Sequence, residues 1–180
     1  NWMNGQYIRN LSEEELLARL IPFWEEAGLI ASPPPTEIRH TLKLLVPLVQ
    51  ERLKTLRDVV ELTDFVFDEI ETPPVEKLIG KKMTAVESRE AIQKVQDLLA
   101  GLLQFDAEVI EQEMRQLAKD MDLKAGQLFS IVRNATTGKR VSPPLFGTLE
   151  ALGRTKTLKR LERAEEALFE HIKSPSETGL

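Results

Sequence analysis

Basic side chains gather in one stretch near the C-terminal end of the sequence, where their chemistry would be the binding of phosphate groups. Lys and Arg aligned on one surface bind a nucleic-acid backbone because each charge releases a condensed counterion. The same charges are also consistent with a solvated surface, since Lys and Arg pair with acids three or four residues away on a helix. Both interpretations stay open for this stretch, which consists of Lys139, Arg140, Arg154, Lys156, Lys159 and Arg160.

Residues that would catalyse a reaction or bind a metal form no familiar motif. The sequence has two His, His40 and His171, and no Cys, so the usual structural zinc sets cannot be assembled. It contains no Gly-rich phosphate loop, no GxSxG and no HExxH. Neighbouring acids such as Glu165 and Glu166 fall on helix faces that we expect to be solvated. We therefore predict no catalytic residue, no metal site and no cofactor within this chain.

Composition restricts the class of protein further. The 180 residues carry a formal net charge of -5, which argues against binding nucleic acid by bulk attraction, so any RNA contact must be local. No apolar run approaches the roughly 18 residues of a membrane span, and the sequence does not open like a signal peptide. The absence of Cys excludes disulfides and fits a reducing compartment. We expect a soluble, cytoplasmic protein.

The elements that must position the basic stretch are all helices. Apolar residues recur at spacings of three and four, and no pair of strands is indicated. Ser12 with Glu15 forms a capping box, which marks the start of one helix. The sequence predicts an irregular all-α bundle, a helix cage, of about eight helices. They are expected near residues 12–28, from 36, 55–65, 91–101, from 106, 128–135, 142–153 and 158–168.

Local signals place some helix starts and one boundary. Thr55 is expected to cap the third helix, and Ser142 to cap the seventh, with Pro143 at its first helical position. Prolines at 73 and 74 interrupt the helical pattern. We therefore expect two small subdomains, residues 1–72 and 73–180.

Three blocks of the sequence resemble one protein family. Residues 1–9, NWMNGQYIR, resemble the WMNG-x-YIR sequence of bacterial glutamyl-tRNA synthetases. Residues 50–56, QERLKTL, agree with the same family, and residues 128–153, LFSIVRNATTGKRVSPPLFGTLEALG, are similar to its LR-x-A-x-TG and (S/T)P-x-LF stretch. The blocks keep the family's order and span nearly the whole chain, and they resemble its C-terminal anticodon-binding domain.

The resemblance implies a role in RNA recognition. The family's helix cage grips the anticodon loop of tRNA(Glu) and reads unstacked bases, whose edges and faces are exposed in a single-stranded loop. The catalytic domain, which uses ATP and Mg²⁺, is expected to lie upstream and outside this chain. We therefore expect no aminoacylation by this chain alone, and its expected partners are tRNA(Glu) and that catalytic domain. We expect a monomer.

Arg52 is the residue to which the resemblance gives the sharpest role. The resemblance places it on the family position that contacts the third anticodon base and favours cytosine over uracil, and hence tRNA(Glu) over tRNA(Gln). A guanidinium can donate to the O2 and N3 acceptors of cytosine. Without the family match, Arg52 would be interpreted as a solvated helix residue.

The block at residues 128–153 supplies the other expected contacts. The resemblance places Arg133, Ser142, Pro143 and Leu145 around the remaining anticodon bases, with Lys139, Arg140 and Lys156 available to phosphates. Pro144 stands where the family often has Gly, and it removes an N–H that could have contacted RNA.

Two alternatives remain. The two aromatic residues of the opening block, Trp2 and Tyr7, could stack on RNA or pack against the rest of the enzyme. Composition and periodicity alone would also permit a helical scaffold that binds protein partners and has no RNA role.

Overall fold

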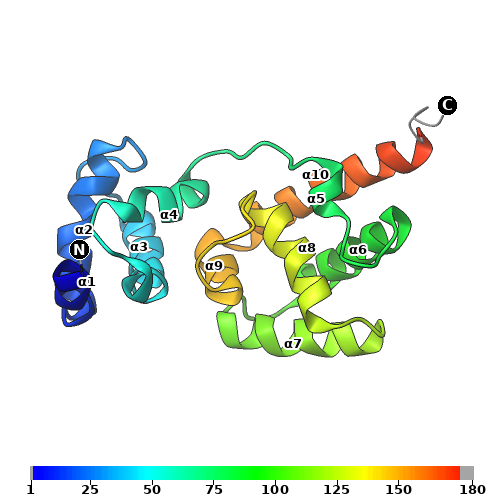
Figure 1. Cartoon of the computed structure of the whole chain (residues 1–180), viewed down its shortest axis with the longest axis horizontal. Coiled ribbons are helices and arrows are strands. Elements are labelled where there is room, and N and C mark those ends of the chain that lie inside the picture. The colour runs from blue at the N-terminus through cyan, green and yellow to red at the C-terminus, as the bar shows by residue number, and fades with distance from the viewer. Residues whose placement is uncertain (1, 175–180) are drawn as a thin grey trace. The chain divides into compact units, whose positions relative to one another are not determined.

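The computed structural model describes residues 2–174, and every regular element in that range is helical (Figure 1). The all-α prediction is therefore confirmed, with ten α-helices and one 3-10 turn among the described residues. The elements are α1 (Trp2–Arg9), α2 (Glu13–Glu26), α3 (Thr36–Val49), η1 (Gln50–Arg52), α4 (Asp58–Phe67), α5 (Val75–Leu78), α6 (Ala85–Gly101), α7 (Ala107–Asp120), α8 (Ala125–Thr137), α9 (Leu145–Leu152) and α10 (Arg154–Lys173).

The chain forms two compact units. The first unit contains the residues up to Glu69 together with Ser142–Leu152, and the second contains Ile70–Val141 together with the residues from Gly153 onward. The sequence assigned residues 142–153 to the C-terminal subdomain. The structure corrects that assignment, because α9 packs against α3 of the first unit.

Trp24 lies at the centre of the first unit, where α2 packs against α3 and α4. Its indole Nε1 donates to Thr63 Oγ1 at 2.8 Å, and that hydroxyl donates in turn to the carbonyl of Val59 at 2.6 Å. The ring of Phe67 meets the indole edge to face, with centroids 6.3 Å apart. Both buried polar groups are thus satisfied inside an apolar core.

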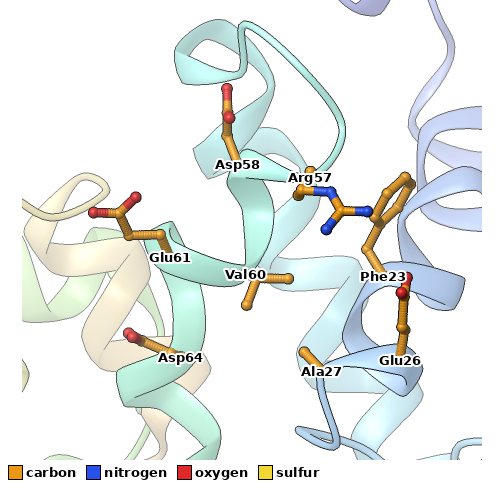
Figure 2. Close-up of a pocket in the computed structure, with 8 residues that line it drawn as sticks. All are labelled: Phe23, Glu26, Ala27, Arg57, Asp58, Val60, Glu61 and Asp64. Atoms are coloured by element: carbon orange, nitrogen blue, oxygen red, sulfur yellow. The ribbon is translucent and has the colours of Figure 1, made fainter.

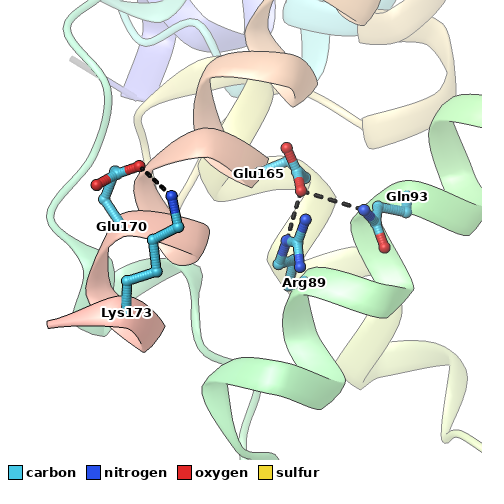
Figure 3. Close-up of polar contacts among 5 residues, drawn as sticks. All are labelled: Arg89, Gln93, Glu165, Glu170 and Lys173. Atoms are coloured by element: carbon cyan, nitrogen blue, oxygen red, sulfur yellow. Dashed lines mark hydrogen bonds and ion pairs between the residues drawn. The ribbon is translucent and has the colours of Figure 1, made fainter. Parts of the chain in front are cut away.

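The pairing of α6 with α10 organises the second unit. Ile92, Val95 and Leu99 of α6 are fully buried, as is Leu161 of α10. At the rim of this contact, Glu165 accepts from Arg89 Nε at 2.5 Å and from Gln93 Nε2 at 3.1 Å (Figure 3). An apolar interior with a polar rim is what an amphipathic helix pair produces.

Some helix starts agree with the sequence and others do not. The capping box of Ser12 with Glu15 is present. Thr55 does not cap the third helix, because α4 begins only at Asp58. Likewise α9 begins at Leu145, so Pro143 is not its first helical residue; the carbonyl of Pro144 accepts from the amide of Thr148 at 3.0 Å. Consecutive prolines keep the chain extended until that point.

Two helices were not expected from the sequence. Helix α1 has only eight residues and contains Asn4 and Gly5, which are both weak helix formers. Helix α5 has four residues between Pro74 and Gly80, too few for a periodic pattern. Neither helix would be stable by itself, so tertiary contacts must hold them.

The Trp24–Thr63 bond gives a test of the first core. Thr63→Val keeps the side-chain shape but removes the hydroxyl, leaving the indole N–H buried without an acceptor, so we expect the free energy of unfolding to fall by ~1–3 kcal/mol. Urea unfolding followed by circular dichroism measures it. Thr155→Val at an exposed position is the control, and equal losses in the two variants would contradict this account.

Candidate nucleic-acid interface

Arg52 ends η1, directly after α3, and its side chain is exposed. Within the described range 2–174, it has no hydrogen-bond or ion-pair partner. A guanidinium without a partner in that range keeps its donors available for a ligand.

The backbone around Arg52 is fixed from the side of α1. The side-chain nitrogen Nε2 of Gln50 donates to the carbonyls of Ile8 at 3.0 Å and Leu11 at 2.9 Å, at and just beyond the end of α1. On the other side of Arg52, Leu53 is buried, with 1% of its surface exposed. Gly5 of α1 passes close to this backbone, since a Cβ on it would lie 3.7 Å from the Leu53 carbonyl oxygen. Arg52 therefore projects from an immobilised turn.

Asp58 fixes the turn that follows. Its carboxylate accepts from the amides of Lys54 at 3.0 Å and Thr55 at 2.9 Å, and from the Thr55 hydroxyl at 2.8 Å. Burial alone would raise the pKa of Asp58, but these hydrogen bonds outweigh it and hold the pKa below the ordinary 3.8. Sequence reasoning missed both Gln50 and Asp58, although an Asp three residues after Thr55 is a local turn signal.

The start of α9 belongs to the same unit as Arg52. Helix α3 packs against α9, and the close approach needs Gly147, because a Cβ there would meet the side chain of Leu48. The expected contact residues Ser142, Pro143 and Leu145 are all buried. Ser142 Oγ donates to the Pro143 carbonyl at 3.0 Å, so this hydroxyl is engaged within its own turn.

Three other expected residues lie in the second unit, at the end of α8. Arg133 and Lys139 are half-buried and Arg140 is exposed. The buried hydroxyl of Thr137 donates to the Arg133 carbonyl at 2.7 Å and accepts from the Lys139 amide at 3.0 Å. Gly138 ends the helix with φ +66°, the left-handed conformation that a helix C-terminus commonly requires.

The basic residues of α10 do not form one exposed track. Arg160 is 3% exposed and donates to the Thr136 carbonyl at 2.7 Å. Arg154 is half-buried and donates to the Leu102 carbonyl at 2.5 Å. These two guanidinium groups satisfy carbonyls near the ends of α6 and α8, which favours a structural role over the phosphate contacts that the sequence left open. Lys156 is half-buried.

The first unit has a hollow of about 600 Å³ between α2 and α4 (Figure 2). The ring of Phe23 lies beside the guanidinium of Arg57 at one side of it. The acidic residues that line it would repel the phosphates of RNA, so we do not assign the nucleic-acid interface to this hollow. They are Glu26, Asp58, Glu61 and Asp64.

Metal-ligand clusters and membrane-spanning helices are two further features for which residues 2–174 can be compared with the sequence. No three His, Cys, Asp or Glu side chains in that range gather so as to hold a metal ion. None of the helices described has the length and apolar character needed to cross a membrane. Tyr7 is 54% exposed, with Arg19 Cζ 6.0 Å from its ring centroid, while the side chain of Trp2 lies outside the described residues.

Known sequences relate these features to one family. Residues 15–165 match the family model described as "Anticodon binding domain". A glutamate–tRNA ligase of Roseiflexus sp. (strain RS-1) is 46% identical over 169 residues, which are 94% of this chain and 33% of that protein. One from Dehalococcoides mccartyi is 42% identical over 171 residues, or 94% of this chain and 35% of the relative. The chain thus spans about a third of the length of these relatives.

A solved structure has the same fold. The glutamate tRNA ligase from Elizabethkingia meningosepticum superposes with a TM-score of 0.78, covering 93% of this chain and 32% of that one. The two are 23% identical in sequence, so the likeness concerns the fold.

The turn at Asp58 gives a prediction about pH. Because the folded pKa lies below 3.8, the carboxylate's stabilising contribution is complete above that pH and is lost as the pH falls through the folded pKa. Asp58→Asn removes the charge and one of the two acceptor oxygens, so it should lower the free energy of unfolding by ~0.5–1.5 kcal/mol near neutral pH, the net value of a typical hydrogen bond. This deficit should shrink below pH ~3.8.

Urea unfolding of both proteins, at about pH 7 and about pH 3, measures the effect. Asp97→Asn is the matched control, since Asp97 is exposed and has no hydrogen-bond partner among the described residues. If Asp58→Asn lowered the free energy of unfolding equally at both pH values, the ionised carboxylate would not be what stabilises this turn.

Proposed function

The chain belongs to the family of anticodon-binding domains, and we therefore propose that it recognises the anticodon of tRNA(Glu) as part of a glutamate–tRNA ligase. The observation that carries the proposal is the exposed Arg52 without a protein partner, held between Gln50 and Asp58. A fixed backbone reduces the entropy lost when a side chain orders on a ligand.

The proposed discrimination follows from the donors of Arg52. Cytosine offers the adjacent acceptors O2 and N3 on its Watson–Crick edge beside its N4 donor, whereas guanine and uracil each place an N–H donor at the centre of that edge. A guanidinium has donors only, so a base with a donor at that position leaves it unpaired. The wrong base then costs the free energy of an unmet hydrogen bond in a partly desolvated site.

The start of α9 has a different part in the proposal. Because Ser142, Pro143 and Leu145 are buried, we assign them to shaping the surface on which a base rests, rather than to donating to it. Pro144 is exposed and lacks an N–H, so it offers an apolar ring face to an unstacked base.

The second unit contributes charge in this proposal. Arg133, Lys139 and Arg140 surround the end of α8, where Thr137 fixes the backbone. We assign them to the anticodon arm, with Arg133 contacting a base and the other two contacting phosphates. Lys156 is assigned to phosphate as well.

The rest of the ligase reaction falls outside this chain in our proposal. Activation of glutamate with ATP and Mg²⁺ is assigned to the remaining two thirds of the relatives' length. We also propose that the parent protein acts in the cytoplasm as a monomer.

Arg52→Ala tests the proposal. We expect labelled anticodon stem-loops of tRNA(Glu) to bind the chain more tightly than those of tRNA(Gln), and the substitution to reduce that preference by ~1–3 kcal/mol, the scale of a specific base contact. Fluorescence anisotropy at fixed salt concentration measures both affinities.

Arg39→Ala is the matched control, because Arg39 is an exposed arginine on α3 in the same unit. It removes the same charge and should weaken both RNAs equally without changing the preference. Equal binding of both stem-loops and of an unrelated RNA by the unmodified chain would defeat the proposal. Retention of a protein partner and no RNA would favour a scaffold role.

A further inference from the structure

A short segment of the second unit, residues 77–82, is bonded to α8 at two points. Asn134 Nδ2 donates to the carbonyl of Lys77 at 2.8 Å. Two turns earlier on α8, Gln127 Nε2 donates to the carbonyl of Lys81 at 2.7 Å. Gln127 Oε1 also accepts from the backbone amide of Lys124 at 3.0 Å. The side chain of Gln127 therefore connects this segment to the start of α8. The segment therefore runs along the helix on fixed attachments.

Tight packing prevents the segment from drifting away from α8. Gly80 is buried, and a Cβ on it would come within 2.9 Å of Ile131 Cδ1. Lys82, two residues later, has φ +61°, a left-handed conformation that few residues other than Gly, Asn and Asp adopt. The side chains on this segment thus start from a defined backbone.

Four lysines share this support. Lys77, Lys81, Lys82 and Lys124 are all exposed, and none of their ammonium groups has a hydrogen-bond or ion-pair partner among residues 2–174. We call these four residues the lysine row. Unpaired like charges on a rigid support repel each other, and a polyanion relieves that repulsion.

The acids of the same region form no ion pair with these lysines among residues 2–174. Glu87 accepts from the amide and the hydroxyl of Thr84 and so serves as the cap of α6. The first turn of α8 contains no acid, so the positive end of that helix adds to the row. Glu76 and Asp122 are the nearest acids in sequence, and both are exposed.

We propose that the lysine row binds consecutive phosphates of an RNA backbone and forms the phosphate track of the second unit. The proposal rests on the RNA-binding function proposed above. It replaces the track expected on α10, where Arg154 and Arg160 are engaged with backbone carbonyls. Asn134 holds the carbonyl of Lys77, the first residue of the row. Asn134 directly follows Arg133, which the proposed function assigns to the anticodon arm. Phosphate contacts of this kind set position and affinity without reading bases.

The test is the triple variant Lys81→Gln/Lys82→Gln/Lys124→Gln in the full chain. We expect roughly tenfold weaker binding of the tRNA(Glu) stem-loop at about 0.1 M salt, with the preference over the tRNA(Gln) stem-loop unchanged. A plot of log affinity against log salt should become shallower by about 0.7 for each lost contact with single-stranded RNA. Circular dichroism checks that the helices remain.

The matched control is Lys94→Gln/Lys119→Gln/Lys173→Gln, which removes the same charge from exposed positions elsewhere in the second unit. It should leave the affinity within about twofold of the parent, because the proposal assigns no phosphate contact to these three lysines. A second readout is acetylation of lysines followed by mass spectrometry. Bound stem-loop should protect the lysine row and leave Lys94 and Lys119 reactive.

Outcomes separate this proposal from the proposed function. In one outcome, Arg52→Ala loses the preference for the tRNA(Glu) stem-loop while the triple variant binds RNA as tightly as the parent. In that case the lysine row does not bind RNA phosphates, and the proposed anticodon recognition is still supported. Equal losses of RNA affinity in the two triple variants would also contradict the proposed role of the lysine row. If the parent chain binds no RNA, the proposed function and the row both fail. Poly-glutamate serves as an acidic-protein probe in the same assay: if the triple variant loses affinity for poly-glutamate but keeps the affinity of the parent for RNA, the row binds an acidic protein and the proposal is wrong.

Discussion

The side-chain amide of Gln50 holds together the part of the first unit on which RNA recognition depends. The single nitrogen Nε2 of Gln50 donates to two carbonyls, that of Ile8 in the last turn of α1 and that of Leu11 just beyond the helix. The bonds attach α1, which would be unstable alone, to the turn that presents Arg52. Asp58 fixes the next turn by accepting from the amides of Lys54 and Thr55. The flexible side chain of Arg52 therefore extends from a backbone that is fixed on both sides.

Burial decides which of the many basic residues are available to a ligand. A buried guanidinium must be hydrogen-bonded, and Arg160 meets that requirement by donating to the backbone at the end of α8. The exposed Arg52 and the lysine row have no such engagement. An acidic chain can therefore bind a polyanion, because the sum of its charges says little about the few that project from rigid segments.

Local signals in the sequence predicted much of the fold. The capping box at Ser12 joins residues only three positions apart, so its pattern can be recognised directly in the sequence. The packing of α9 on α3 and the bond from Gln127 to Lys81 join residues far apart in sequence. No periodicity encodes such contacts. For the candidate site, the resemblance selected Arg52, while Gln50 and the lysine row became visible only with coordinates.

The discontinuous first unit has a consequence for biosynthesis. Its last helix, α9, comes from Ser142–Leu152, which is translated after most of the second unit. A ribosome making this chain releases α1 to α4 long before the partner surface for α3 exists. Leu48 of α3 must therefore wait for α9, and the first unit cannot reach its final stability until Leu152 has emerged.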